Sequence, residues 1–265
     1  MLSSRPRCPA LTASSAALLL VVMLAQAAVA ADQFGVTAER PDLTALLKRM
    51  TQAQSENRAR TKAYSVTREY KVFGADANRP RTEVVAKVNF LPPNVKSYDI
   101  DQSTGGMGEK VIRHILDHEV DATRDPRGMM VNEQNYSFDF LDDDALNGQP
   151  CYRLKITPKH ERKDLLKATL WVDKDSYQIV RLEGDPVKSP SFWVKDVHLV
   201  LEFADVAGMW LQTETNAMAR LRFGGEYKIT SHDVDYDVAH AVAVNASPAA
   251  PHRRHQSAMV AASMR

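Results

Sequence analysis

Alternation of apolar and polar residues is the dominant pattern between about residues 64 and 236. In residues 64–72, apolar side chains occupy every second position, and only Arg68 interrupts the apolar side. A period of two is typical of a half-buried β-strand, because successive side chains point to opposite faces. Alternation, or enrichment in β-branched and aromatic residues, predicts further strands at residues 83–90, 95–101, 152–157, 167–173, 177–183, 193–203, 210–221 and 226–236.

The links between these strands are short and carry turn-forming residues. Residues 142–144 (three aspartates), 147–148 (Asn-Gly), 207–208 (Ala-Gly) and 224–225 (Gly-Gly) are interpreted as turns, and residues 92–94 (Pro-Pro-Asn) as a break between two strands. Parallel pairing needs a crossover of about a dozen residues or more, so strands joined this closely must pair antiparallel. The pattern therefore predicts one large curved antiparallel sheet.

Two segments repeat their apolar residues with the helical period instead. In residues 43–60 apolar side chains fall at i, i+3, i+4 and i+7, and in residues 109–122 they form one stripe. The second segment follows Gly105 and Gly106, which we interpret as a hinge. We expect this helix to lie across the concave side of the curved sheet.

The N-terminus has the pattern of a secretory signal peptide. Arg5 and Arg7 precede an apolar run at residues 16–25, which ends in an Ala-Val-Ala site at residues 28–30. We therefore predict that residues 1–30 are cleaved during export and that residues 31–238 form the mature domain.

Composition narrows the possible functions only slightly. The net charge of +1 favours no nucleic-acid partner. Cys8 lies in the predicted signal peptide, which leaves Cys151 alone and rules out an internal disulfide. Residues 239–265 lose the alternation and contain no acidic residue, and we predict that they form a disordered tail.

Few residues suggest catalysis. His114 and His118 have the i, i+4 spacing of a metal pair, but their context matches no zinc-hydrolase motif and favours a solvated helix face. Cys151 starts a strand, where a lone cysteine is more often a small buried hydrophobe than a nucleophile. The aspartates at residues 142–144 lack the ligand spacing of a calcium loop. We therefore predict no enzyme activity, no cofactor and no metal.

A charged run at residues 159–167 separates two predicted strands. Its mixture of basic and acidic residues is typical of a solvated connection. Contact with an anionic membrane surface is the alternative interpretation.

The order of helices and strands from residue 41 to residue 238 resembles that of the LolA/LolB-like superfamily. Residues 148–159, 170–184 and 188–203 are especially similar to outer-membrane lipoprotein-sorting proteins of that superfamily. The resemblance implies an α+β fold: an incomplete antiparallel β-barrel (a LolA-like half barrel), with helices covering its concave face and a hydrophobic cavity. It also implies a monomeric periplasmic carrier of lipids or lipoprotein acyl chains for outer-membrane sorting, with transient contacts to membrane-associated donor or acceptor proteins.

One position departs from the family pattern. Pro92 stands where the family carrier has an arginine that helps to gate its lid, and Lys96 is the nearest cation. The departure bears on a lipoprotein-specific opening cycle more than on lipid binding itself.

Apolar residues on the inward positions of the first strands and of the second helix are the predicted cavity lining, with three tryptophans added. An alternative function is a lipid-responsive sensor that docks a protein partner, with the tail as the spare segment for docking. The predicted lining consists of Val66, Tyr70, Val84, Val88, Phe90, Ile112, Ile115, Leu116, Trp171, Trp193 and Trp210.

Overall fold

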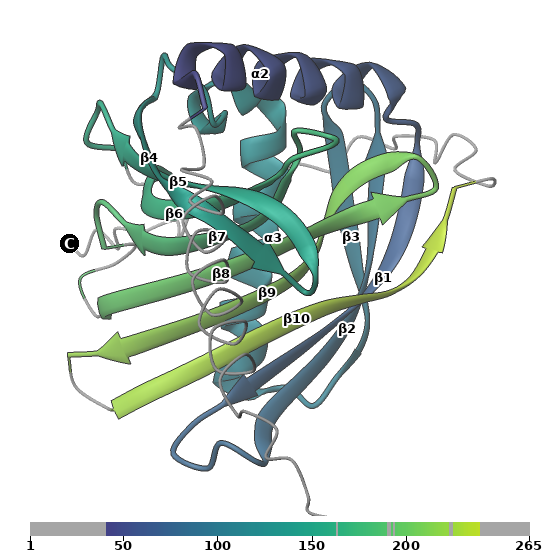
Figure 1. Ribbon diagram of the computed structural model, residues 1–265. Helices are drawn as coiled ribbons and strands as arrows, with labels where there is room; N and C mark the ends of the chain where they lie inside the picture. Colours follow the sequence, from purple (N-terminus) through teal and green to yellow (C-terminus); the bar gives the residue numbers. More distant parts are fainter. Residues whose placement is uncertain (1–40, 163, 190–191, 193, 223–224, 239–265) are drawn as a thin grey trace, which may run out of the picture. The chain divides into compact units, whose positions relative to one another are not determined.

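Ten antiparallel strands form one sheet in the part of the chain that the structure describes (Figure 1). The structure is a computed structural model that describes residues 41–162, 164–189, 192, 194–222 and 225–238. The features below belong to the unit that begins at Leu43. The strands are β1 (Tyr64–Phe73), β2 (Pro80–Leu91), β3 (Val95–Ser103), β4 (Tyr136–Leu146), β5 (Gln149–Pro158), β6 (Leu166–Asp173), β7 (Ile179–Pro186), β8 (Val194–Val206), β9 (Met209–Leu221) and β10 (Gly225–Asp237).

Two α-helices and one short 3₁₀-helix accompany the sheet in the described residues. Helix α2 spans Leu43–Arg60, as predicted, and the 3₁₀-helix η1 spans Pro126–Met129. Helix α3 spans Gly106–Arg124 and so begins three residues earlier than predicted. Gly105 and Gly106 have φ angles of 78° and 83°. Residues other than glycine rarely adopt such positive φ angles, which explains the two glycines at the start of the helix.

The sheet order is β3-β2-β1-β10-β9-β8-β7-β6-β5-β4. Chain neighbours pair antiparallel through short links wherever they pair, which confirms the prediction of an antiparallel sheet. The pairing of β1 with β10, in which Val66 lies opposite Tyr236, joins the first three strands to the last seven. Strands β3 and β4 are the two open edges, so the sheet is consistent with an open half barrel.

The prediction of a turn at residues 142–144 is wrong. Asp142, Asp143 and Asp144 lie inside β4, and the turn to β5 is formed by Asn147 and Gly148. The aspartates are compatible with a strand because β5, β6 and the turn after β6 supply their partners. These partners are Arg153 for Asp142, Lys174 for Asp143, and the indole N–H of Trp171 for Asp144.

One face of the sheet is apolar along most of its width. Residues directly opposite each other on paired strands share a face. The register places Leu154, Leu170, Leu182 and Leu201 in one row across β5, β6, β7 and β8. We call the face that carries this row the apolar face.

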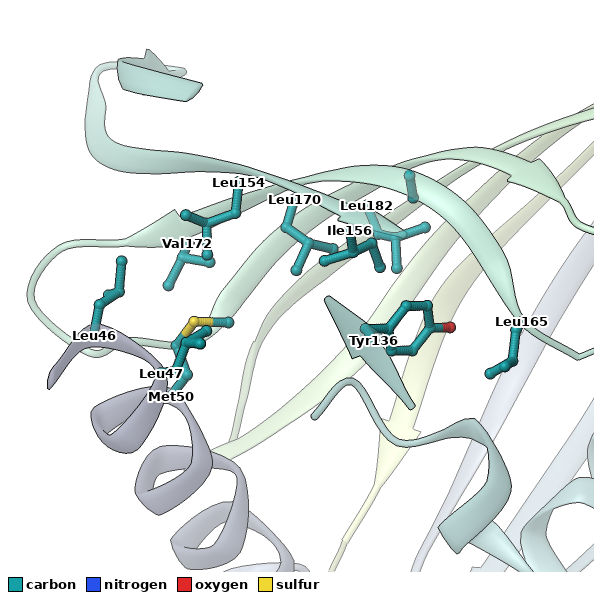
Figure 2. Close-up of a cluster of buried hydrophobic side chains, with 11 residues drawn as sticks. Leu46, Leu47, Met50, Tyr136, Leu154, Ile156, Leu165, Leu170, Val172 and Leu182 are labelled. Atoms are coloured by element: carbon teal, nitrogen blue, oxygen red, sulfur yellow. The ribbon is translucent and has the colours of Figure 1, made fainter. Parts of the chain in front are cut away.

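Each helix packs against the apolar face at a different end of the sheet. Leu46, Leu47 and Met50 of α2 pack in a buried cluster with residues of β4 to β7, including Leu154 and Leu170 (Figure 2). Ile112 and Leu116 of α3 pack in a second cluster with residues of β1 and β2. Covering of a concave face by the helices stays a prediction.

Shortening a side chain in the α2 cluster tests this packing. Leu154 is fully buried, whereas Lys155 next to it is exposed on the opposite face. We expect Leu154→Ala to lower the free energy of unfolding by about 2–5 kcal/mol, because it removes buried methyl groups and leaves a cavity. Lys155→Ala should change it by less than about 0.5 kcal/mol. Urea unfolding followed by circular dichroism measures both, and equal effects would contradict the assigned faces.

Candidate functional site

Most residues of the predicted lining lie in the packed core beneath α3. Val66, Tyr70, Val84 and Val88 on the sheet are at most 3% exposed, and they form one cluster with α3. Ile112 and Leu116 of α3 complete this cluster, which we call the α3 cluster, and Ile115 packs against it. The structure therefore brings these residues together, but as side chains in contact with one another. Their role in ligand binding stays a prediction.

Phe90 and the three tryptophans lie elsewhere. Phe90 is half-buried and its ring lies 5.4 Å from the ring of Tyr64. Trp171 lies opposite Arg153 and Arg181, on the face away from the Leu154 row, and its indole N–H bonds Asp144. A one-residue step along β6 from Leu170 accounts for this orientation. We therefore leave Trp171 out of the lining proposed below.

Trp210 anchors α2, and Trp193 lies outside the described residues. The backbone N–H of Trp210 donates to Asn57 Oδ1 at 2.7 Å, and Asn57 Nδ2 donates to the Trp210 carbonyl at 2.8 Å. The indole N–H donates to the carbonyl of Ile179 at 2.7 Å. Three hydrogen bonds thus connect Trp210 to α2 and β7.

Between the buried parts of the two clusters, part of the apolar face carries side chains that are only half-buried. It is formed by apolar-face residues of β8, β9 and β10, none of which belongs to the predicted lining. Its outer members pack against the clusters on either side. Leu199 lies opposite Gly184 and Ala217, and Ala217 lies opposite Ile229. We call this surface the apolar strip. Its members are Val197, Leu199, Leu201, Phe203, Ala217, Ala219, Tyr227 and Ile229.

One side of α3 adds exposed apolar residues. Met107, Val111 and Ile115 follow one another at intervals of four residues and so share a side of the helix. Met107 is 73% exposed and Val111 is 39% exposed. His118 on the same side lies 3.5 Å from Asp164 in the β5–β6 connection, whereas Tyr98 of β3 bonds Asp117 on the other side. This row of α3 therefore faces away from β3.

A hollow of about 560 Å³ lies beside one end of the apolar strip. Val197 and Ala219 of the strip contribute to its walls, together with His198 and Met218 of the opposite face. Side chains of both charges also line the hollow: Lys195, Arg220, Asp185, Asp196 and Glu226.

A buried network of charges joins α3 to the sheet. Arg68 of β1 is 7% exposed and lies on the apolar face. Its guanidinium donates to both oxygens of the Asp233 carboxylate of β10, through Nε and through Nη2 at 3.1 Å. Its Nη1 donates to Glu119 of α3 at 3.0 Å. Lys96 lies 3.3 Å from Glu119, and the Tyr236 hydroxyl donates to Asp233 at 2.6 Å. The interruption at Arg68 was the only sequence signal for this network.

A β-bulge supplies the partner of Arg68. Val66 lies opposite Tyr236, but Arg68 lies opposite Asp233, so the register shifts between Thr67 and Arg68. In the unshifted register Arg68 would face Val234. The extra residue places the Asp233 carboxylate on the apolar face, and leaves Val234 47% exposed.

Attraction between the opposite charges of the network offsets the cost of removing them from water. Burial acts to raise the pKa of Glu119, but the charges of Arg68 and Lys96 outweigh it and hold that pKa below its ordinary value. Burial raises the pKa of Tyr64 to about 12 and also raises the pKa of Tyr70 and of Tyr236. At neutral pH the tyrosines are therefore neutral, and Glu119 carries its charge.

His118 and Cys151, two of the residues considered for chemistry, have local partners. His118 faces Asp164, and burial raises the pKa of the Cys151 thiol, whose Sγ lies 3.4 Å from the carbonyl of Gln149. Among the described residues, no three His, Cys, Asp or Glu side chains come together as a metal site would require. In the charged run, Lys159 bonds the Glu133 carbonyl and Arg162 pairs with Asp164. No helix in the described part of the chain could cross a membrane.

Comparison with known proteins finds similarity at the level of fold. No protein-family model and no curated protein matches the chain. An outer membrane lipoprotein-sorting protein domain from Vibrio parahaemolyticus is 14% identical, with 74% of this chain and 94% of that one covered and a TM-score of 0.42. A DUF1329 family protein from Desulfovibrio piger is 12% identical, with 77% and 96% covered and a TM-score of 0.42.

A LolA superfamily protein from Nitrosomonas europaea is 12% identical, with 72% of this chain and 93% of that chain covered and a TM-score of 0.38. Two of these three structures thus carry the names of lipoprotein-sorting or LolA superfamily proteins. The likeness concerns the fold alone.

Removing the cation of the buried network should destabilise the protein strongly. Arg68→Met leaves Asp233 and Glu119 as buried charges without their main partner, and should lower the free energy of unfolding by about 3–5 kcal/mol. Arg124→Met is the matched control, since its pair with Asp121 is mostly exposed, and should cost less than about 1 kcal/mol. Urea unfolding at pH 7 compares the two, and a similar small loss in both would contradict a structural role for the network.

The contribution of Glu119 should disappear in acid. Its pKa in the folded protein lies below the unfolded value of about 4.3, so the stabilisation is complete above that pH and is lost as the pH falls through the folded value. The difference in unfolding free energy between the native protein and Glu119→Gln should therefore be largest at neutral pH and shrink below about pH 4. Urea unfolding across this range measures it, and a difference that is independent of pH would refute the assignment.

Proposed function

We propose that the protein is a carrier that binds the acyl chains of lipids or lipoproteins on the apolar strip. The single observation that supports the proposal most is that the apolar side chains of this strip are only half-buried, whereas the two clusters that they border are buried. A contiguous apolar surface that the protein's own side chains cover incompletely is typical of a binding site. The predicted signal peptide places the proposed carrier in the periplasm.

The chemistry of the strip favours an alkyl chain. Leu199 and Ile229 provide aliphatic contacts, and Ala217 and Gly184 keep the surface between them low. Each methylene group removed from water contributes about 0.8 kcal/mol, so a long acyl chain gains affinity without any specific polar contact. Met107 and Val111 of α3 offer exposed apolar surface for the same chain.

In this proposal, the α3 cluster provides further apolar surface that a ligand could contact after a movement of α3. Val66, Tyr70, Val84 and Val88 become accessible only if α3 moves away from β1 and β2, and the contact of Arg68 with Glu119 opposes that motion. We expect the direction of transfer to depend on relative affinity, because an acyl chain passes to the acceptor that binds it more tightly.

Two adjacent residues of β8 provide a matched test. Leu199 lies on the apolar strip, whereas Val200 is similarly half-buried on the opposite face between Glu183 and Asn216. We expect Leu199→Glu to weaken binding of a fluorescent fatty-acid probe at least about tenfold, which corresponds to the contacts of roughly two methylene groups. Val200→Glu should stay within about twofold of the native protein.

Val111→Glu is a second variant. Val111 is already exposed, so this variant should fold normally and still bind the fatty-acid probe more weakly than the native protein does. Native mass spectrometry of the native protein purified from its own compartment should reveal bound acyl species. Absence of such species, together with no displacement of the probe, would refute the proposed function.

A further inference from the structure

Strand β3 is an unpaired edge with a hollow beside it. It ends the sheet at one side, so the backbone groups that point away from β2 have no strand partner in the described residues (Figure 1). Exposed edges of this kind accept an added strand. A hollow of about 490 Å³ lies between this strand and α3, lined by Lys96, Ser97, Tyr98, Asp117, Val120, Asp121 and Arg124.

The other edge, β4, is less suited to receive a strand. Its register with β5 shifts between Phe140 and Asp142, so that Leu141 bulges at the edge. Bulges of this kind twist an edge away from further pairing. The β3 register with β2 shifts only near the end of the strand, beyond Ile100. The first half of β3, beside the hollow, is regular.

The last described strand ends level with the start of β3. Asp237 lies opposite Ser65, Ser65 lies opposite Asn89, and Asn89 lies opposite Ser97, so the four residues form one row across the sheet. With about 4.8 Å between neighbouring strands, the row spans about 14 Å from β10 to β3, and about 19 Å from β10 to a strand added beyond β3. About six extended residues cover the longer distance. The β4 edge lies six strands from β10, twice as far as β3.

We propose that residues 242–247 of the C-terminal tail bind the β3 edge as an eleventh strand, in the hollow beside α3. This segment reads Val-Ala-Val-Asn-Ala-Ser, and its second residue lies six positions after residue 237, which is the number that the crossing requires. Its two valines have the period of a strand and would meet Val120 of α3. Pro248 follows directly, and proline cannot continue the pairing because it lacks a backbone N–H.

Charge favours the tail over a second copy of the chain. Asp99 and Asp101 on β3 and Asp121 on α3 are exposed around the edge. Two β3 edges brought together would bring these carboxylates close to one another, which is destabilising. Residues 239–265 contain no acidic residue and include three arginines, so their charge complements this edge.

The bound tail would hold α3 in its packed position. It would bridge β3 and α3 on the side where Tyr98 already bonds Asp117. The inference goes beyond the proposed lipid binding and does not depend on it, since it assigns a partner for a different side of α3.

Hydrogen exchange of the full chain tests the proposal. Val242→Pro combined with Val244→Pro removes two backbone donors from the pairing segment. Ala258→Pro combined with Val260→Pro is the control, with the same spacing but beyond the segment. In the native protein and in the control, β3 amides that point away from β2 should exchange about tenfold more slowly than in the first variant.

Each outcome decides between the occupants. Equal exchange of β3 in the native protein and in the Val242→Pro, Val244→Pro variant would overturn the proposal. So would protection that fades on tenfold dilution, because it would identify a second copy at the edge. Loss of protection in the control as well would show that the pairing segment is not the one named. Urea unfolding confirms that the domain itself is unchanged in both variants.

Discussion

The contact between one buried guanidinium and two carboxylates connects parts of the structure that are far apart in the chain. Arg68, Glu119 and Asp233 come from the first strand, the second described helix and the last strand. A charge that is removed from water is stable only with close partners, so every arrangement that separates these three residues is costly. The network thereby favours the β1–β10 pairing and the seat of α3 at the same time. Apolar contacts alone would tolerate small shifts of both.

Local patterns in the sequence predicted the helices and strands, but they did not predict which distant strands pair. The period of two located the strands, and the helical stripe at residues 43–60 located α2 with the observed limits. The pairing of β1 with β10 joins residues more than 150 positions apart, and no local pattern encodes it. Asp142 to Asp144 suggested a turn because aspartate is common there. Their partners lie on β5, on β6 and in the turn after β6, so no local pattern indicates them, and these partners make the strand acceptable.

The candidate site shows why alternation cannot separate a core from a lining. Val88 and Leu199 are both aliphatic and lie in the same alternating context, yet the first is buried beneath α3 and the second is only half-buried. The difference depends on which part of the apolar face a helix reaches. That depends in turn on Arg68 and Glu119. A single arginine on the apolar side of a strand was thus a stronger signal about the site than the aromatic residues.

Because of the bulge at Val234, the number of residues in β10 can change without a change in its pairing with β1. If this residue were missing, Asp233 would still meet Arg68 and Asp235 would still meet Thr67, because the register on either side already differs by one. Insertions and deletions are normally tolerated in loops and rejected within strands. Here a strand inside the sheet can lose one residue without exchanging any partner on β1. The local twist of the sheet would change instead, so curvature at this point can evolve independently of the charge network beside it.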